Sequence, residues 1–219
     1  MKILVINLKE REDRLKLFQS CNPSIDFEVV SAVDGKQVSY KKLLELGFDV
    51  AHDWIDPLLN TPLTKGEVGC FLSHWRIWEK CIARNEKVLV LEDDARITED
   101  FNLEEIDELS DIYDFLYLGW KEMEESIPLS GKLVQPVYPY WALGYVITPN
   151  AARILVNEVA RKNIIPVDEY LPKKMPDLRV AGYSENIVNP VSRYELGSNI
   201  LGTNRYDYFL DFKTHLCTV

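Results

Sequence analysis

The chain has 219 residues, and 47% of them are hydrophobic, so we expect a packed globular core rather than a disordered chain. The formal net charge is −10. Residues 92–125 carry 14 acidic and two basic side chains, a local charge of −12, so the rest of the chain is near +2. No long stripe of Lys and Arg is present, and the composition therefore argues against nucleic-acid binding.

The start of the chain and its cysteines indicate the compartment. The apolar run in residues 1–8 is too short for a signal peptide, and no apolar run approaches the ~20 residues of a membrane span. Cys70 and Cys81 are predicted on one helix, about 16 Å apart by helical rise, so they cannot bridge each other. With Cys21 and Cys217 they form no CxxC pair. We expect reduced thiols and a cytoplasmic protein with at most peripheral contact at the inner membrane face.

Strands and helices alternate from the first residues, which predicts an α/β fold. Lys2–Leu8 is an apolar, β-rich run typical of a buried parallel strand. A charged helix is predicted over Glu10–Ser20, followed by a second strand over Phe27–Val33 that ends at the turn residues Asp34-Gly35. This order is typical of the βαβ unit that opens many nucleotide-binding domains.

A short helix is predicted near residues 40–46, and a longer helix begins after Thr64. Thr64 and Glu67 have the spacing of a capping box. The apolar residues that follow at helical spacing are Val68, Phe71, Leu72, Trp75, Trp78 and Ile82. Asn85-Glu86 ends this helix, and the buried strand Lys87–Leu91 comes next.

The second half of the chain is predicted with fewer regular elements. Further strands are expected over Asp114–Leu118 and Ala142–Thr148, and a helix from Pro149 to about Lys162, with proline at its first position. The chain from Ile164 onward is expected to be mostly loop with short strands. Such a loop-rich segment on an α/β core often binds a substrate.

Three carboxylates, Glu92-Asp93-Asp94, directly follow the predicted strand 87–91. Ligands of open α/β sheets bind beyond the carboxyl ends of the strands. Adjacent like charges are costly unless a cation or hydrogen-bond donors neutralise them, and Mg²⁺ or Mn²⁺ takes one or two carboxylates together with phosphate oxygens. The triplet therefore indicates either a metal site for a diphosphate or a solvated acidic turn.

Polar residues near the first two strands offer contacts for phosphate and ribose. Asn7 lies near the end of the first strand, and Arg11 and Arg14 begin the following helix. Arginine suits bidentate phosphate binding, although these residues equally suit a solvent-facing helix surface. Asp34 would hold a ribose hydroxyl, or it belongs to a plain turn.

Two further pairs of residues have both a functional and a structural interpretation. Ser73 and His74 lie beside the apolar stripe of the long helix, where a histidine either is structural or contacts the donor phosphate or sugar. Asp168 and Glu169 follow a proline, and one carboxylate would supply a general base that takes a proton from a hydroxyl group. Alternatively, Asp168 caps a short helix through Leu171.

Taken together, these segments resemble glycosyltransferase family 25, which holds bacterial lipooligosaccharide galactosyltransferases and the domains of collagen galactosyltransferases. The combination of GEVGCFLSHW with LEDDA is specific. The matching pieces occur in the family's order and are VINLKEREDR (5–14), SAVDG (31–35), LTKGEVGCFLSHWRIW (63–78), VLVLEDDA (88–95), LYLG (116–119), LGYVIT (143–148), IPVDEYL (165–171) and GSNI (197–200).

The resemblance implies a GT-A type fold with a mostly parallel central sheet flanked by helices, and one domain over residues 1–219. Residues 1–120 would form the nucleotide-sugar-binding half and residues 121–219 the acceptor-binding half. It also implies a UDP-sugar donor, most often UDP-galactose, and Mn²⁺ or Mg²⁺. The transfer would proceed with inversion to a saccharide or glycolipid acceptor such as lipooligosaccharide.

The resemblance also assigns roles to residues. Asp94 looks like the last acid of a DxD-like motif and would ligate the metal with Glu92. Asp168 looks like the carboxylate near the acceptor and is preferred over Glu169 as the base. The donor would be bound by Asn7, Arg11, Arg14, Asp34, Ser73, His74, Glu92 and Asp93.

One departure from the family bears on specificity. Many members place a Gly-Thr pair where this chain has Trp141-Ala142, so the sugar or acceptor pocket is expected to differ. Two rival functions remain. A metal-dependent phosphohydrolase would use the acidic cluster with a second set of metal ligands, which neither His52 nor His215 offers in a recognisable spacing. A non-catalytic sugar-binding relative would keep the fold without turnover.

Overall fold

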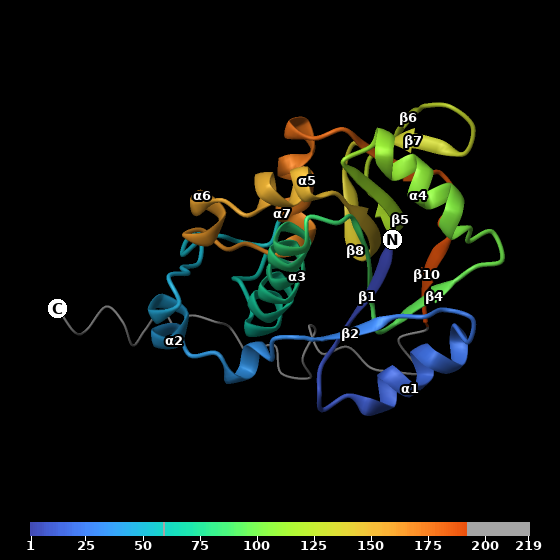
Figure 1. Ribbon diagram of the computed structural model, residues 1–219. Coiled ribbons are helices and arrows are strands. Elements are labelled where there is room, and N and C mark those ends of the chain that lie inside the picture. The colour runs from blue at the N-terminus through green and yellow to red at the C-terminus, as the bar shows by residue number, and fades with distance from the viewer. Residues whose placement is uncertain (59, 192–219) are drawn as a thin grey trace.

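The computed structural model describes residues 1–58 and 60–191, which form an eight-stranded sheet with helices on both faces (Figure 1). The strand order is β2-β1-β3-β8-β5-β9-β7-β6. The strands of this sheet are β1 (Lys2–Asn7), β2 (Glu28–Ser31), β3 (Val88–Glu92), β5 (Phe115–Glu122), β6 (Ile127–Pro128), β7 (Leu133–Gln135), β8 (Pro139–Ile147) and β9 (Val180–Tyr183). A separate antiparallel pair is formed by β4 (Ala95–Ile97) and β10 (Val188–Pro190).

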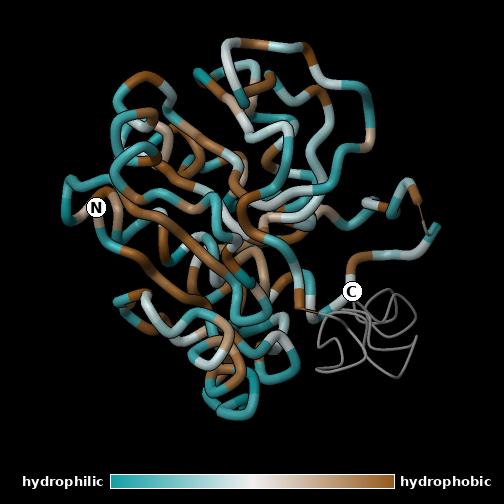
Figure 2. Tube along the Cα trace, turned by 90° about the vertical axis from the view of Figure 1, so that its right-hand side faces the viewer, coloured by the Kyte–Doolittle hydropathy of each residue, from teal (hydrophilic) through white to brown (hydrophobic). Residues whose placement is uncertain are grey.

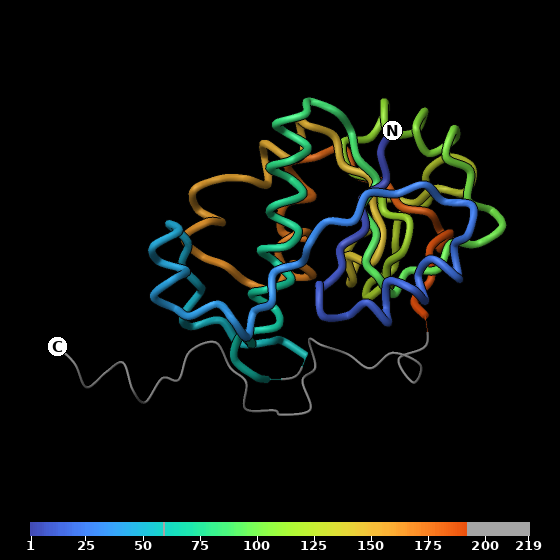
Figure 3. The backbone as a smooth tube through the Cα atoms, turned by 60° about the horizontal axis from the view of Figure 1, so that its bottom comes forward, coloured from blue at the N-terminus to red at the C-terminus, as the bar shows by residue number. Residues whose placement is uncertain are grey.

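The helices connect these strands and cover the sheet. They are α1 (Glu12–Cys21), α2 (Tyr40–Glu45), α3 (Lys65–Arg84), α4 (Leu103–Ile112), α5 (Pro149–Leu155), α6 (Glu158–Arg161) and α7 (Val167–Lys174), with short 3₁₀ turns η1 (Gly35–Gln37) and η2 (Met175–Asp177). Helix α3 lies beside one face of the sheet together with α5 and α7, and α1 and α4 lie toward the other face (Figures 1 and 3). No described helix is long and apolar enough to cross a bilayer.

Most strands of the sheet point in one direction. Strand β1 is parallel to β2 and β3, β5 is parallel to β9, and β8 runs antiparallel between β3 and β5. Strands β7 and β6 add an antiparallel hairpin to β9. Six of the eight strands therefore share a direction and two oppose it, which confirms the predicted α/β fold with a mostly parallel central sheet. The predicted βαβ opening is also confirmed, since α1 joins the parallel pair β1 and β2.

Alternate residues of the central strands supply two separate cores. On β1, Leu4 and Ile6 belong to the cluster beneath α3, whereas Ile3 and Val5 belong to the cluster beneath α1 and α4. Successive side chains of a strand point to opposite faces, so a strand that is apolar throughout requires cover on both sides. Hydrophobic residues accordingly gather along the central strands, and hydrophilic residues occupy the outer loops (Figure 2).

Helix α3 begins and ends as predicted. The Thr64 side chain accepts from the backbone N–H of Glu67, and the Glu67 carboxylate accepts from the backbone N–H of Thr64, which is the reciprocal capping box. Asn85 ends the helix in the left-handed conformation, with φ of 52°. Between them, Phe71, Trp75 and Trp78 pack into the core.

Three local predictions differ from the structure. The helix expected from Pro149 to Lys162 is two helices, because the Asn157 side chain caps a second helix by accepting from the N–H of Ala160. The chain after Ile164 contains the full helix α7, and Asp168 does not cap it, since Pro166 is the N-cap residue. Helix α4 was not expected within the acidic stretch.

The expected domain organisation stays a prediction. Strand β8 comes from the proposed acceptor half and pairs with β3 of the donor half, and β5 crosses the boundary at residue 120. The segment GSNI at 197–200, His215 and Cys217 lie outside the described residues. Among the described cysteines, Cys21, Cys70 and Cys81 are free thiols.

Candidate active site

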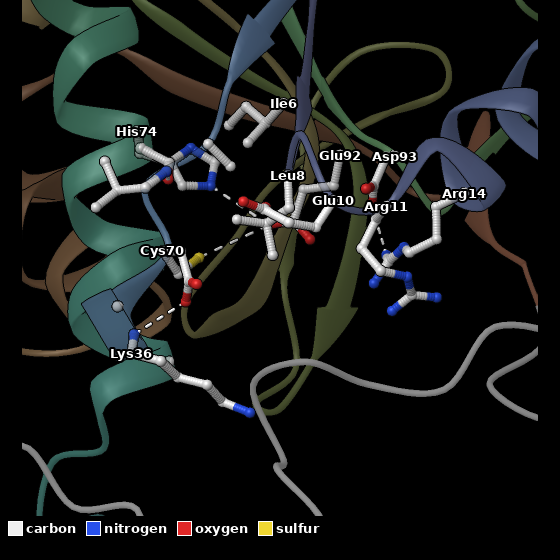
Figure 4. A pocket seen from close by; sticks show the side chains of 16 residues that line it. Ile6, Leu8, Glu10, Arg11, Arg14, Lys36, Cys70, His74, Glu92 and Asp93 are labelled. Atoms are coloured by element: carbon white, nitrogen blue, oxygen red, sulfur yellow. Dashed lines mark hydrogen bonds and ion pairs between the residues drawn. The ribbon is translucent and has the colours of Figure 1, made fainter. Parts of the chain in front are cut away.

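A pocket lies where β1 and β3 end, between α1 on one side and α3 on the other (Figure 4). Because β1, β2 and β3 are parallel neighbours, their carboxyl ends meet at this edge, where ligands of open α/β sheets bind. The residues that line it are Ile6, Leu8, Glu10, Arg11, Arg14, Ala32, Val33, Asp34, Gly35, Lys36, Gly66, Cys70, Ser73, His74, Glu92 and Asp93.

The loop after β2 forms one wall of this pocket and packs directly on α3. Ser73 Oγ accepts from the backbone N–H of Val33 at 2.8 Å and donates to the Gly69 carbonyl at 2.7 Å. A Cβ atom at Gly69 would lie 2.6 Å from the Val33 carbonyl oxygen, so glycine permits this close approach. Asp34 accepts from the backbone N–H of Lys36 at the start of η1. The loop is thus fixed by contacts from α3.

Asp93 is the carboxylate of the triplet with the most partners. It accepts from the Asn7 amide at 2.7 Å and forms an ion pair with Arg14 at 2.5 Å. All three side chains are buried, and burial raises the pKa of Asp93 to about 6 against the opposing effects of Arg14 and Asn7. Asn7 itself does not line the pocket. Asp93, Asn7 and Arg14 therefore form a buried network that fixes the turn after β3.

Only one of the two carboxylate oxygens of Asp94 is paired with a cation. Its Oδ2 lies 3.0 Å from the Arg14 guanidinium, whereas its Oδ1 is buried and has no hydrogen-bond partner among the described residues. The backbone carbonyl of Asp94 accepts from the N–H of Val191 at 2.7 Å, which ties the turn to the chain after β10. A buried carboxylate oxygen without a partner is costly and suits a cation ligand.

Glu92 lies between α3 and the rest of the triplet. Its Oε1 is 3.3 Å from His74 Nε2 and 4.0 Å from Cys70 Sγ (Figure 4). Burial, followed by the charges of Asp94 and Asp93, raises the pKa of Glu92 to about 8. The Glu92 carboxyl therefore combines a raised pKa with two weak contacts, one to His74 and one to Cys70.

His74 is held by a chain of buried hydrogen bonds. Trp78 Nε1 donates to the Tyr145 hydroxyl at 3.0 Å, and that hydroxyl lies 2.8 Å from His74 Nδ1. If the hydroxyl donates to Nδ1, the His74 proton is on Nε2 and points to Glu92. Each donor in this series of hydrogen bonds, from Trp78 to Glu92, then has an acceptor. Burial lowers the pKa of His74 to about 4, so the ring is neutral near pH 7.

Cations lie opposite α3 and at the rim. Arg11 and Arg14 come from the α1 side of the pocket, and Lys36 lies at the start of η1 (Figure 4). Arg11 is bound to Asp13 at 2.8 Å, and this hydrogen bond raises the pKa of Arg11. The pocket thus combines acidic groups at its base with cations around it, an arrangement that suits an anion bound through a metal ion.

Asp168 and Glu169 lie on the first turn of α7, which contacts β8, and they do not line the pocket. Asp168 accepts a hydrogen bond from the backbone N–H of Ala142. Burial and the charge of Glu92 raise the pKa of Asp168 to about 7. Glu169 is buried and accepts a hydrogen bond from the Tyr138 hydroxyl.

Trp141 directly precedes Ala142, whose backbone N–H donates to Asp168, and Trp141 itself has an unusual backbone conformation. Its φ is 75°, in the region that non-glycine residues rarely adopt, which costs on the order of 1–3 kcal/mol. Glycine would adopt the same φ without this strain. The strain thus lies beside the predicted base.

The structure brings most of the predicted donor-side residues together, but not all. Arg11, Arg14, Asp34, Ser73, His74, Glu92 and Asp93 line the pocket. Asn7 stands behind Asp93, and Asp94 stands beside it. Cys70, Lys36 and Tyr145 were not predicted at the site. The spacing of Cys70 four residues before His74 would have revealed Cys70, whereas the contact with Tyr145 depends on strand pairing.

Comparisons with known proteins identify the family of the chain. The model of glycosyltransferase family 25 (LPS biosynthesis protein) matches residues 1–134. Human procollagen galactosyltransferase 2 is 37% identical over 198 residues, covering 84% of this chain and 32% of that protein. The chain belongs to glycosyltransferase family 25. A glycosyltransferase 25 family member of Anopheles gambiae is 41% identical over 184 residues, covering 78% of this chain and 31% of its own length.

The coverage of these relatives and one further relative limit what family 25 membership implies. The chain spans about a third of the length of these curated relatives. The probable inactive glycosyltransferase 25 family member 3 of Bos taurus is 38% identical over 184 residues, covering 78% of this chain and 31% of that protein. Among solved structures, the inositol-1-phosphate CTP transferase of T. maritima has a TM-score of 0.43 at 13% identity, covering 90% of this chain and 91% of that chain.

Proposed function

We propose that this protein is an inverting glycosyltransferase that moves a hexose from a UDP-sugar to a saccharide acceptor such as lipooligosaccharide, with galactose as the favoured hexose. The observation that carries the proposal is the unequal pairing of the acidic triplet at the edge of the sheet. Asp93 is fully paired, whereas Asp94 keeps an unpartnered buried oxygen and Glu92 keeps a raised pKa. Asp94 and Glu92 thus remain to bind a cation, beside a pocket that Arg11 and Arg14 also line.

The residues present fit Mn²⁺ or Mg²⁺. Both are hard cations that prefer carboxylate oxygens and retain open positions for phosphate oxygens. Asp94 and Glu92 would hold the ion, and Arg14 would orient Asp94 through its other oxygen. The bound ion would supply neutralisation of the negative charge on the departing diphosphate.

The protein's own groups would bind and orient the donor. Arg11 and Lys36 line the pocket and are suited to contact phosphate oxygens. Asp34 lies on the loop fixed to α3, lines the pocket and would accept from a ribose hydroxyl. Ser73 and His74 would act indirectly, Ser73 by holding that loop and His74 by holding Glu92.

Asp168 is proposed as the general base. Its carboxylate would take the proton of the acceptor hydroxyl while the acceptor oxygen forms a bond to the anomeric carbon. The bond from that carbon to the diphosphate oxygen breaks, and UDP leaves from the opposite face. A pKa of about 7 suits a base near neutral pH, because it balances the ionised fraction against proton affinity. Glu169, bound by Tyr138, is the less suitable candidate.

The acceptor half, residues 121–219, is proposed to set acceptor choice, with Trp141 beside Asp168 shaping the pocket. The placement of the protein in the cytoplasm, with at most peripheral contact at the inner membrane face, is proposed on the sequence alone.

The test is nucleotide release from a panel of UDP- and GDP-sugars with Mn²⁺, with and without a saccharide acceptor panel. We expect release from a UDP-sugar, and we expect Asp168→Asn to lose turnover while it retains UDP binding. Glu169→Gln is the matched control and should retain turnover. Absence of release from every UDP-sugar would contradict the proposal, as would full turnover of Asp168→Asn.

A non-catalytic role is the second candidate, favoured by the resemblance to the probable inactive family member of Bos taurus. That role predicts UDP binding without turnover across the whole acceptor panel. Turnover of any UDP-sugar that depends on Asp168 would exclude it.

A further inference from the structure

Three potential ligand atoms of different chemistry meet on the α3 side of the pocket. Cys70 Sγ, His74 Nε2 and a carboxylate oxygen of Glu92 all lie within 4.8 Å of one another. Cys70 and His74 are four residues apart on α3 and therefore project from the same face of the helix. All three residues line the pocket, so an ion can reach them from solvent.

The distances are close to those around a tetrahedral metal ion. Zinc bonds of about 2.0–2.3 Å to nitrogen, oxygen and sulfur give tetrahedral ligand-to-ligand distances of about 3.3–3.6 Å. The measured separations are 3.3 Å from His74 Nε2 to Glu92 Oε1 and 4.0 Å from Cys70 Sγ to the same oxygen. Cys70 Sγ lies within 4.8 Å of the histidine ligand atom, so a rotation of the Cys70 side chain toward His74 would complete three ligand positions, with the fourth open to the pocket.

The outer contacts of the cluster also fit a metal site. Metal-bound histidines usually form a hydrogen bond through the ring nitrogen that does not bind the ion. His74 Nδ1 has this contact with the Tyr145 hydroxyl. With the ion on Nε2, the ring proton would move to Nδ1 and donate to the Tyr145 oxygen, which also accepts from Trp78. Trp78 fixes that hydroxyl from its other side.

We propose that Cys70, His74 and Glu92 form a binding site for a thiophilic divalent cation such as Zn²⁺. Binding would release the Cys70 thiol proton to solvent, because the thiolate is the ligand. The donor set distinguishes this site from the proposed transfer site at Asp94 and Glu92, since hard Mn²⁺ and Mg²⁺ prefer oxygen, whereas thiolate and imidazole suit zinc. The two sites share Glu92, so their ions compete, a consequence that rests on the proposed function.

The test uses Co²⁺ as a spectroscopic substitute for Zn²⁺, with the purified full chain and no sugar nucleotide. We expect a thiolate-to-cobalt charge-transfer absorption band. Added Zn²⁺ should abolish this band by displacing Co²⁺, and added Mg²⁺ should leave it unchanged. Cys70→Ser should remove the band or weaken Co²⁺ binding by at least about tenfold. Cys21→Ser and Cys217→Ser are the controls for adventitious thiol binding and should retain the band. Because no donor is present, the result is independent of whether the protein transfers sugar.

A second measurement on the unmodified protein avoids any folding defect of the variants. Zn²⁺ should protect Cys70, but not Cys21, from alkylation, as measured by peptide mass spectrometry. Absence of the cobalt band in the wild-type protein would overturn the proposal. Persistence of the band in a folded Cys70→Ser variant, or alkylation of Cys70 that saturating Zn²⁺ does not slow, would overturn it equally.

Discussion

The buried hydrogen bonds of Tyr145 allow a quantitative prediction. Tyr145→Phe removes one hydroxyl and leaves Trp78 Nε1 and His74 Nδ1 without their partner in a fully buried environment. Each unsatisfied buried group costs about 1–3 kcal/mol, so for the two groups we expect a loss of about 2–6 kcal/mol in the free energy of unfolding. At about 2–4 °C per kcal/mol for a chain of this size, the melting temperature should fall by about 4–24 °C.

Tyr117 provides a matched control. It is the register partner of Tyr145 on the neighbouring strand, it is equally buried, and its hydroxyl has no partner within the part of the chain that the structure describes. Tyr117→Phe should therefore change stability by no more than about 1 kcal/mol, and in the stabilising direction if at all. Both variants would be measured by urea denaturation at the same pH. Equal stability of the two variants would refute the assignment of the buried hydrogen-bond chain.

Two further predictions concern the pocket itself. Gly69→Ala places a Cβ atom 2.6 Å from the Val33 carbonyl oxygen, so it should destabilise the protein by about 1–3 kcal/mol in urea denaturation and weaken UDP binding; unchanged stability would contradict the close approach. The pKa of Glu92 is raised from its ordinary value of 4.5 to about 8, so between these two pH values the folded state binds more protons than the unfolded state, and the metal-free protein should lose stability as the pH rises from 6.5 to 8. His74, whose pKa is lowered to about 4, opposes this effect only near pH 6.5, where the unfolded histidine still binds protons, whereas Asp168, whose pKa is raised to about 7, acts in the same direction as Glu92. Glu92→Gln should flatten this part of a thermal-melt pH series, and an equally steep slope in that variant would contradict the assignment.

The elements that the sequence predicts correctly are those whose signals lie within a few neighbouring residues. The apolar strand over residues 2–7 and the capping box at Thr64 are encoded within a few residues, and both formed where predicted. Helix α4 was missed because its acidic residues conceal a narrow apolar stripe that contributes one buried side chain, Ile106, to the core. The break between α5 and α6 depends on the cap at Asn157, which helical periodicity alone does not reveal.

The sequence indicates where a site is expected but not the contacts within it. A buried strand ending in three carboxylates predicts a site at this edge of the sheet, and the structure has a pocket there. Sequence alone could not show that Asn7 and Arg14 pair with Asp93, because that pairing requires α1 and β3 to meet in space. Likewise, the contact of His74 with Tyr145 depends on the antiparallel insertion of β8 beside β3.

The most direct test of the proposed transfer site is the Mn²⁺ dependence of UDP binding in Asp94→Asn. Asparagine keeps the size of the side chain and removes the charge that the ion requires. Isothermal titration of the wild-type protein should show tighter UDP binding with Mn²⁺ than without it. The account predicts that the folded Asp94→Asn variant loses this difference together with UDP release from the sugar donor. Mn²⁺-dependent binding and turnover at wild-type levels in Asp94→Asn would contradict it.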